Sequence, residues 1–131
     1  MKKRGHGVGK WNGPGGKLLP HETPTEAAIR ETSEEIGVTP IVSMPLGHIH
    51  FHDETAGDWT CTVFRTDEWD GEPTESEEMK PQWFDITDLP YDTMWNGDDK
   101  WMPLVVEGKK FRAEMWFDEK QKNTKAEIKE L

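Results

Sequence analysis

Residues 16–38 read GKLLPHETPTEAAIRETSEEIGV, and this stretch predicts a helix preceded by a glycine-rich loop. The helix start is TPTE at residues 23–26, where Thr can cap, Pro suits the first turn and Glu completes a capping box. Gly37 is typical of a helix end. The sequence therefore predicts a helix over roughly 24–36. Its expected apolar stripe is Ala28, Ile29, Thr32 and Ile36.

Three carboxylates gather on one face of this predicted helix. Glu31, Glu34 and Glu35 occupy positions i, i+3 and i+4, which are neighbours on a helix surface. Like charges at these spacings repel, so helix propensity does not explain them. An acidic run is usually a solvated face, but this cluster also suits a hard cation such as Mg²⁺ or Mn²⁺, which binds carboxylate and phosphate oxygens. These three residues alone leave both interpretations open.

The spacing around the cluster resembles the Nudix box. Gly16 is followed after five residues by Glu22, which is followed after seven by Arg30, where the run RETSEEIGV begins. The family pattern continues from this Arg as Arg-Glu-aliphatic-x-Glu-Glu-x-Gly-aliphatic, and Thr32 departs from it at the first aliphatic position. The resemblance, with the box at 16–38, implies an α/β (α+β) Nudix fold in which a mixed β-sheet is sandwiched between helices.

The same resemblance implies the chemistry of the site. Nudix enzymes hydrolyse a nucleoside diphosphate linked to another group and hold divalent cations on the box helix. Mg²⁺ is the implied cofactor, with Mn²⁺ as a possible substitute. The implied metal ligands are Gly15, Glu31, Glu34, Glu35 and Glu78. The implied catalytic residues, in which Arg30 fixes a neighbouring Glu and either Glu35 or Glu78 acts on the attacking water, are Glu35, Glu34, Glu78 and Arg30.

A closer resemblance, to the animal MutT-homologue subfamily, extends to about residue 117. It is carried by MKKRG at 1–5, GKWNG at 9–13, ESEEM at 75–79 and MW at 94–95. That subfamily hydrolyses oxidised purine nucleoside triphosphates, such as 8-oxo-dGTP, to the monophosphate and pyrophosphate. The substrate-binding residues that this resemblance implies are Lys2, Asn12, Gly15, Gly16, Lys17, Phe51, Met79, Trp95, Asp98 and Asp99.

The positions that read the base leave an alternative open. The subfamily uses an adjacent pair of Asp residues, which can share a proton so that one of them donates to the base. An ungapped match places Gly97 and Asp98 at these positions, whereas a shift of one residue makes Asp98 and Asp99 the pair. Asp53 stands at the position that partners Phe51 and is expected to make the pocket more polar.

The remaining segments predict a sheet. Runs of apolar and β-branched residues bounded by turn residues indicate strands, and strands mixed with helices in a short chain indicate one α+β or mixed α/β domain over 1–131. The expected elements, in order, are a short strand near 1–4, an antiparallel pair at 41–52 and 59–66, a short strand at 81–84, a helix near 98–107, a final strand at 110–117 and a frayed end from 118.

The composition excludes several functional classes. The 131 residues include 16 Lys and Arg against 26 Asp and Glu, for a formal net charge of −10. Sequence-independent nucleic-acid binding needs cationic side chains, and no apolar run approaches the roughly 20 residues of a membrane span. The N-terminus lacks the apolar region of a signal peptide, and the single Cys61 fits a reducing compartment. We therefore expect a cytoplasmic protein without nucleic-acid or membrane partners, and the resemblance implies that its partner is a small nucleotide substrate.

Two further motifs receive a plainer interpretation. His48, His50 and His52 alternate, so a strand would place them on one face. A zinc site is conceivable there, but a polar strand face is the commoner outcome. The run GHGVGK at 5–10 lacks the spacing of a phosphate-binding P-loop and is expected to be a flexible loop over the substrate.

The start of the chain bears on function. The subfamily normally has a further strand before the MKKRG segment, and a chain that lacks this strand is expected to expose a sheet edge. Three explanations are open: the start at Met1 is misassigned, the chain folds into a smaller version of the domain, or a homodimer covers the gap. The leading hypothesis is Mg²⁺-dependent hydrolysis of oxidised purine nucleotides, in nucleotide-pool sanitation and DNA repair. The alternatives are a Nudix hydrolase with another nucleoside diphosphate-linked substrate and a truncated, non-catalytic nucleotide-binding scaffold.

Overall fold

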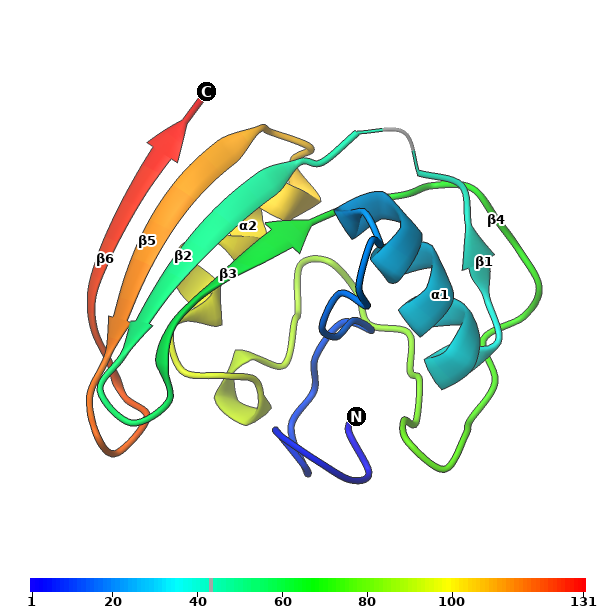
Figure 1. Ribbon diagram of the computed structural model, residues 1–131, viewed down its shortest axis with the longest axis horizontal. Helices are drawn as coiled ribbons and strands as arrows, with labels where there is room; N and C mark the ends of the chain where they lie inside the picture. The colour runs from blue at the N-terminus through cyan, green and yellow to red at the C-terminus, as the bar shows by residue number, and fades with distance from the viewer. Residues whose placement is uncertain (43) are drawn as a thin grey trace. The chain divides into compact units, whose positions relative to one another are not determined.

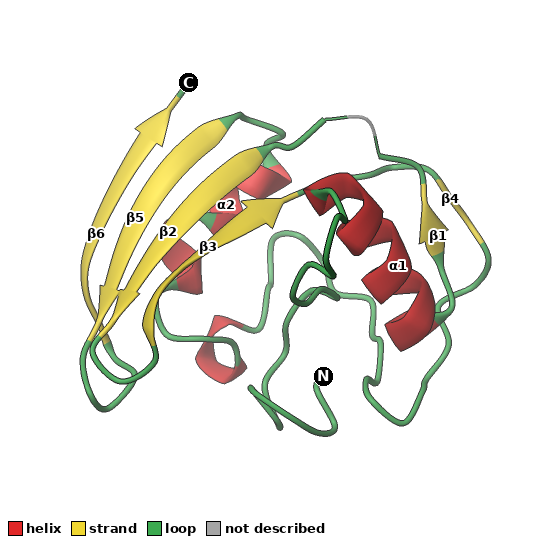
Figure 2. Cartoon of the chain, in the orientation of Figure 1, coloured by secondary structure: helices red, strands yellow, loops and turns green. Residues whose placement is uncertain are grey.

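The computed structural model describes residues 1–42 and 44–131, which divide into two compact units. The first unit comprises Met1–Met44 and Thr66–Trp95, and the second comprises Pro45–Arg65 and Asn96–Leu131. The first consists mostly of loops around one long helix, whereas the second carries the main sheet (Figures 1 and 2). The predicted helix and the predicted antiparallel pair therefore fall in different units.

The first unit is built on α1 (Pro24–Ile36). The predicted capping box is present, because Thr23 Oγ1 accepts from the Glu26 amide at 3.2 Å and Glu26 Oε1 accepts from the Thr23 amide at 3.0 Å. Gly37 ends the helix in the left-handed region, at φ 71°, and donates to the Ser33 carbonyl. The predicted helix bounds are confirmed.

The buried face of α1 differs from the predicted apolar stripe. The buried residues of the helix are Ala27 and Glu35, which are 3% and 1% exposed. Thr32, which stands at the aliphatic position of the box, is half-buried and donates its hydroxyl to the Ala28 carbonyl at 2.6 Å. All four residues of the predicted stripe are only half-buried. A carboxyl group therefore occupies one of the two most buried positions of this helix.

Short elements complete the first unit. β1 (Thr39–Pro40) pairs antiparallel with β4 (Trp69–Asp70), and η1 (Tyr91–Thr93) is a 3₁₀ turn. Near the N-terminus, Lys2 forms an isolated antiparallel bridge with Met79 instead of the strand expected at 1–4. This bridge joins the N-terminal segment to the loop that carries Glu78.

The second unit contains a four-stranded mixed sheet in the order β3-β2-β5-β6 (Figure 1). β2 pairs antiparallel with β3 and parallel with β5, and β5 pairs antiparallel with β6. The bounds of these strands are Gly47–Asp53 for β2, Gly57–Val63 for β3, Phe111–Phe117 for β5 and Asn123–Glu130 for β6. The predicted antiparallel pair is confirmed with shorter strands, and so is the α+β class with a mixed sheet.

The core of the second unit lies on one face of this sheet. β5 alternates buried and more exposed residues with the period of two that a strand imposes. The predicted helix near 98–107 consists of two short elements, η2 (Asp98–Lys100) and α2 (Met102–Val106), and of these α2 packs against the same core. The buried core residues are Ile49, Trp101, Phe111, Ala113, Met115 and Phe117.

Two predictions for the later part of the chain are wrong. The end from residue 118 is not frayed, because β6 (Asn123–Glu130) pairs along β5 and forms an edge of the sheet. The segment 81–84 forms no strand, and its Trp83 side chain is 74% exposed. The mostly polar residues of β6 gave no strand signal. The aromatic residues of segment 81–84 gave a strand signal although no strand forms there.

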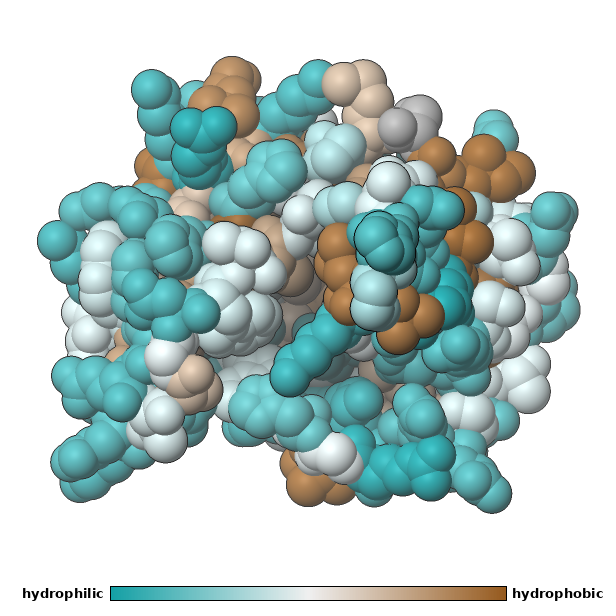
Figure 3. Space-filling model, viewed as in Figure 1, coloured by the Kyte–Doolittle hydropathy of each residue, from teal (hydrophilic) through white to brown (hydrophobic). Residues whose placement is uncertain are grey.

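On the face shown in Figure 3, hydrophilic residues predominate and the hydrophobic ones lie in separate groups. No helix among the described residues has the length and apolar character to cross a membrane.

Candidate active site

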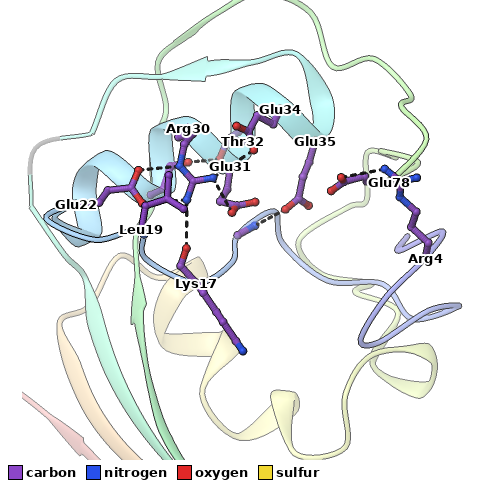
Figure 4. A network of polar contacts seen from close by, with 12 residues as sticks. Arg4, Lys17, Leu19, Glu22, Arg30, Glu31, Thr32, Glu34, Glu35 and Glu78 are labelled. Carbon is purple, nitrogen blue, oxygen red and sulfur yellow. Dashed lines mark hydrogen bonds and ion pairs between the residues drawn. The ribbon is translucent and has the colours of Figure 1, made fainter.

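Arg30 joins the acidic residues around α1 (Figure 4). Its Nε and Nη2 donate to Glu22 Oε2 and Oε1 at 2.7 and 2.9 Å, which makes a bidentate pair. Its Nη1 donates to Glu31 Oε1 at 2.9 Å and to Glu34 Oε2 at 3.3 Å. Nη2 also donates to the Lys17 carbonyl at 3.2 Å. One guanidinium thereby fixes the loop that enters α1 and orients Glu31.

The Arg30–Glu22 contact stays ionised over a wide pH range. The hydrogen bond from Arg30 lowers the pKa of Glu22 to about 2. The same contact raises the pKa of Arg30 above its ordinary value. These two residues of the box therefore act on the position of their neighbours, and neither is poised to exchange a proton near neutral pH.

Glu35 is the buried carboxyl group of the site. Its Oε1 accepts from the Gly15 amide at 3.4 Å, whereas its buried Oε2 meets no hydrogen-bond donor among residues 1–42 and 44–131. Burial, and secondly the facing carboxyl group of Glu31, raise the pKa of Glu35 to about 7, although the charge of Lys2 acts in the opposite direction. Two facing carboxyl groups with a buried unpaired oxygen need a shared proton or a cation.

Gly16 allows the loop before α1 to approach Glu31 closely. A Cβ at this position would lie 2.6 Å from Glu31 Oε1 and 2.7 Å from its Cδ. At Gly13 and Gly15, by contrast, an added Cβ would meet no heavy atom within 4 Å. The glycine that opens the box pattern is therefore the one at which a side chain would collide with a carboxylate.

A loop of the same unit presents Glu78 to this site. Ser76 Oγ donates to the Glu35 carbonyl at 2.6 Å and accepts from the Glu78 amide at 3.2 Å. The Lys3 amide donates to the Glu78 carbonyl at 2.9 Å, and Arg4 Nη2 donates to its carboxylate at 3.1 Å. Sequence reasoning missed Ser76, although a Ser two residues before a candidate Glu is a common turn signal.

The arrangement fits a hard divalent cation. Figure 4 shows the carboxylates of Glu31, Glu35 and Glu78 directed toward one region beside α1, whereas Glu34 is 59% exposed and lies against Arg30. Among the described residues, these oxygens do not form a group of three within 4.8 Å of one another. Carboxylate oxygens are the ligand type that hard divalent cations prefer, and the unpaired Glu35 oxygen is available to act as such a ligand.

The other predicted substrate residues of the first unit have identifiable partners. Trp95 stacks on His6, with ring centroids 4.9 Å apart, and Lys10 Nζ lies 5.2 Å from the Trp95 ring centroid. Asn12 Oδ1 accepts from the Gly13 amide at 2.9 Å. Met79 is 2% exposed. The predicted substrate loop at 5–10 is thus in contact with the predicted stacking residue, Trp95.

The predicted substrate residues of the second unit are Phe51, Asp98 and Asp99. Phe51 stacks on Trp59 at 4.2 Å between ring centroids. Asp98 is 6% exposed, whereas the Asp99 side chain is 51% exposed and lies 3.8 Å from Lys100. Burial therefore distinguishes the two Asp residues that the sequence left equivalent.

The two departures from the subfamily have local explanations. Asp53 Oδ1 accepts from the amides of Thr55 and Ala56, at 2.8 and 2.9 Å, and so closes the turn between β2 and β3. Gly97 has φ 97°, which L side chains rarely adopt, and a Cβ there would lie 2.9 Å from Asn123 Cβ. These turn contacts do not test the expectation that Asp53 makes the pocket more polar, which stays a prediction.

Comparison with known proteins agrees with this geometry. The model of the NUDIX domain matches residues 1–105. The chain belongs to the Nudix family. This Nudix chain is 47% identical over 114 residues to the oxidized purine nucleoside triphosphate hydrolase of Danio rerio, a match that covers 85% of the chain and 72% of the relative. It is 41% identical over 120 residues to the enzyme of the same name from Mus musculus, covering 91% of the chain and 77% of the relative.

A solved structure supports the fold. The crystal structure of the MutT protein from Bacillus halodurans matches with a TM-score of 0.78, covering 92% of the chain and 82% of the MutT chain, at 24% sequence identity. The sequence matches thus carry the family assignment, and the structural match shows the shared fold.

Proposed function

We propose that this Nudix protein is a Mg²⁺-dependent pyrophosphohydrolase of oxidised purine nucleoside triphosphates such as 8-oxo-dGTP. The observation that carries the proposal is buried Glu35, which faces Glu31 with one unpaired oxygen on a helix of the Nudix box. The two relatives named oxidized purine nucleoside triphosphate hydrolases support the substrate class. The products would be a nucleoside monophosphate and pyrophosphate, and the role would be to clear damaged nucleotides from the cytoplasmic pool.

The cation would be held by the carboxylates of Glu31, Glu35 and Glu78, with a backbone carbonyl of Gly15 or Gly16. When bound, Mg²⁺ or Mn²⁺ supplies positive charge for the phosphate chain and for the attacking water. Arg30 keeps Glu31 in place through the 2.9 Å contact, and its bidentate pair with Glu22 keeps Arg30 itself in place. In a chain with a formal net charge of −10, bound cations would reduce the repulsion between the site and a polyphosphate.

Glu35 is our candidate for the group that accepts the proton of the attacking water. In the metal-free protein, burial and the facing Glu31 carboxyl group raise the pKa of Glu35 to about 7, so this group can hold a proton near the pH at which a general base works best. Glu78 is the second candidate, because Ser76 and Arg4 hold it on a loop joined to the end of α1. Glu34 is exposed and paired with Arg30, so we expect it to contribute less than Glu35 and Glu78 to metal binding and to proton transfer.

To recognise the purine base, we propose Asp98 over Asp99, because the Asp98 carboxyl group is buried whereas Asp99 is exposed and lies near Lys100. Asn12 can both donate and accept at the purine edge. Trp95 already contacts His6 and Lys10. A purine base that stacks on Trp95 must therefore pack beside these two side chains or displace them. Lys2, Lys17, Phe51 and Met79 complete the proposed substrate-binding set.

The direct test measures pyrophosphate release from 8-oxo-dGTP, 2-hydroxy-dATP and dGTP, with and without Mg²⁺. We expect Mg²⁺-dependent turnover with kcat/KM for the oxidised nucleotides well above that for dGTP. Equal rates for dGTP and the oxidised nucleotides would refute the specificity but keep the hydrolase. Nucleotide binding without pyrophosphate release, in Mg²⁺ and in Mn²⁺, would favour the non-catalytic scaffold.

A second Nudix substrate remains worth testing because of Gly97. This residue stands at a base-reading position in the ungapped match and cannot offer a carboxyl group there. The same assay therefore includes dinucleoside polyphosphates and other nucleoside diphosphate-linked compounds. A higher kcat/KM for one of these than for 8-oxo-dGTP would replace the proposed substrate and leave the site chemistry unchanged.

A further inference from the structure

The solvent face of the sheet in the second unit carries a cluster of histidines and carboxylates. His50 and His52 lie two residues apart on β2 and therefore project from the same face. In the sheet register, His50 stands beside Glu114 of β5, and His52 stands beside Asp58 of β3. Three adjacent strands thus bring these four side chains together.

The two carboxylates face opposite nitrogens of the two imidazole rings. Glu114 Oε1 lies 3.2 Å from His52 Nε2 and 3.7 Å from His50 Nδ1. Asp58 Oδ2 lies 3.3 Å from His52 Nδ1 and 3.9 Å from His50 Nε2. Each ring therefore has one nitrogen directed at Glu114 and the other directed at Asp58.

We propose that His50, His52 and Glu114 form a binding site for a divalent metal ion of the Zn²⁺ type. The three side chains each offer one ligand atom, and these atoms all lie within 4.8 Å of one another. In a tetrahedral zinc site with bonds of about 2.0–2.1 Å, ligand atoms are roughly 3.3 Å apart. The contacts of Glu114 with the two rings, at 3.2 and 3.7 Å, are close to that spacing.

Asp58 acts as a positioning residue in this site. Histidines that bind a metal through one nitrogen usually donate the other N–H to a carboxylate, which fixes the tautomer and the ring orientation. Asp58 is within hydrogen-bond distance for this role on His52, at 3.3 Å from Nδ1, and lies 3.9 Å from His50 Nε2. Trp116 further holds the His52 ring by stacking, with centroids 4.7 Å apart and planes 14° from parallel.

The surroundings leave the site open to solvent and to a fourth ligand. The side chains of His50 and Glu114 are 42% and 43% exposed, and both line a surface hollow of about 530 Å³. The nearby Glu127 is paired with Lys125 at 3.1 Å, which leaves Glu114 as the carboxylate directed at the rings from β5 and β6. Water can therefore complete the coordination sphere.

This site differs in chemistry from the carboxylates of α1. Imidazole nitrogens suit Zn²⁺ and related transition metals, whereas all-oxygen sites suit Mg²⁺. All four residues belong to the second unit, and none of them has a part in the proposed hydrolysis. The inference therefore stands whether or not the proposed substrate is correct.

Calorimetric titration of the full chain with Zn²⁺, in buffer containing excess Mg²⁺, tests the proposal. We expect one Zn²⁺ per chain at this site and at least a tenfold loss of affinity in His52→Gln. The matched control is His48→Gln, because His48 lies on the same strand and face but outside the cluster. Equal affinity in the wild type and His52→Gln, or an equal loss in His48→Gln, would overturn the proposal.

Two further variants separate this site from the Nudix carboxylates and define the role of Asp58. The Glu31→Gln/Glu35→Gln double variant should keep the Zn²⁺ affinity, and loss of binding would assign the metal to α1 instead. With Co²⁺ as a visible probe, Asp58→Ala should keep the absorption of a tetrahedral site but weaken binding about 10- to 100-fold. Unchanged affinity in Asp58→Ala would remove Asp58 from the site.

Discussion

The molecule carries two clusters of potential metal ligands, and they are built in different ways. On α1, Glu31 and Glu35 are one helical turn apart and share a face because the helix repeats every 3.6 residues. On β2, His50 and His52 share a face because a strand repeats every two. The helical cluster is readable from one segment, whereas the sheet cluster needs Glu114 and Asp58 from two other strands.

Burial separates the two clusters further. Glu35 is 1% exposed, and its pKa is raised to about 7 by burial and by Glu31. The side chains of His50 and Glu114 are more than two-fifths exposed, at 42% and 43%. Burying an ionised carboxylate destabilises the metal-free fold. The buried position of Glu35 therefore lowers the stability of the protein while it raises the pKa of that group. The exposed cluster keeps its polar groups hydrated and has no comparable penalty.

The largest expected effect comes from Glu35→Gln, which removes the proposed proton acceptor and keeps the shape of the side chain. We expect kcat to fall by about 10²- to 10⁴-fold, because an amide cannot take up the proton. Pyrophosphate release under saturating substrate measures this effect. Zn²⁺ binding by the histidine cluster should not change, which makes it an internal control for folding. Turnover within threefold of the wild type would exclude Glu35 from the reaction.

The next effect concerns the stability of the metal-free protein. The folded-state pKa of Glu35 lies above its ordinary 4.5, at about 7. The stability that comes from the protonated form is therefore fully present below pH 4.5 and is lost as the pH rises through about 7. The shift corresponds to at most about 3 kcal/mol, and solvent and the proton shared with Glu31 reduce it.

Glu35→Gln should abolish that pH dependence. In EDTA, we expect the variant to have a higher melting temperature than the wild type at pH 8 and a similar one at pH 4.5. Adding Mg²⁺ at pH 8 should stabilise the wild type more than the variant. Urea or thermal unfolding at several pH values provides the measurement. Parallel pH profiles for the two proteins would show that Glu35 is not strained in the fold.

The same comparison explains what the sequence could and could not predict. The bounds of α1 were predictable because the capping box and Gly37 are local signals. The closeness of Gly16 to Glu31 was not predicted, because the box spacing gives the order of residues and not the path of the loop beside the helix. The interaction of Ser76 with the Glu35 carbonyl spans 41 positions, and no periodicity encodes such a contact.

The sheet was harder to predict because its pairings are non-local. β6 (Asn123–Glu130) has mostly polar, exposed residues, so its register on β5 gives little hydrophobic signal. The alternation of the three histidines was visible, but their carboxylate partners depend on the parallel pairing of β2 with β5 and on the antiparallel pairing with β3. Only the pairing of the strands shows that two carboxylates lie beside the histidines, as a zinc site requires.

A smaller effect is expected from Gly16→Ala. The new Cβ would collide with the Glu31 carboxylate at 2.6 Å, and this flexible group can move away with little cost to folding. We expect kcat/KM to fall about 10- to 100-fold, because misplaced catalytic groups are costly, with little change in melting temperature. Gly13→Ala is the matched control, since its Cβ would meet no atom within 4 Å. Equal activities of the two variants would mean that Gly16 has no role in positioning Glu31.

The smallest effect tests how α1 is anchored. Thr23→Ala removes the side chain that accepts from the Glu26 amide at 3.2 Å and should cost about 1 kcal/mol. Thr23→Ser keeps the hydroxyl and should restore most of that loss in urea unfolding. Amide hydrogen exchange should accelerate in the first turn of α1 but not in β2 and β5, because the cap acts only where the helix begins. If exchange accelerated equally in the sheet, the cap would be stabilising the whole chain cooperatively, and the helical and sheet clusters could not be treated as independent.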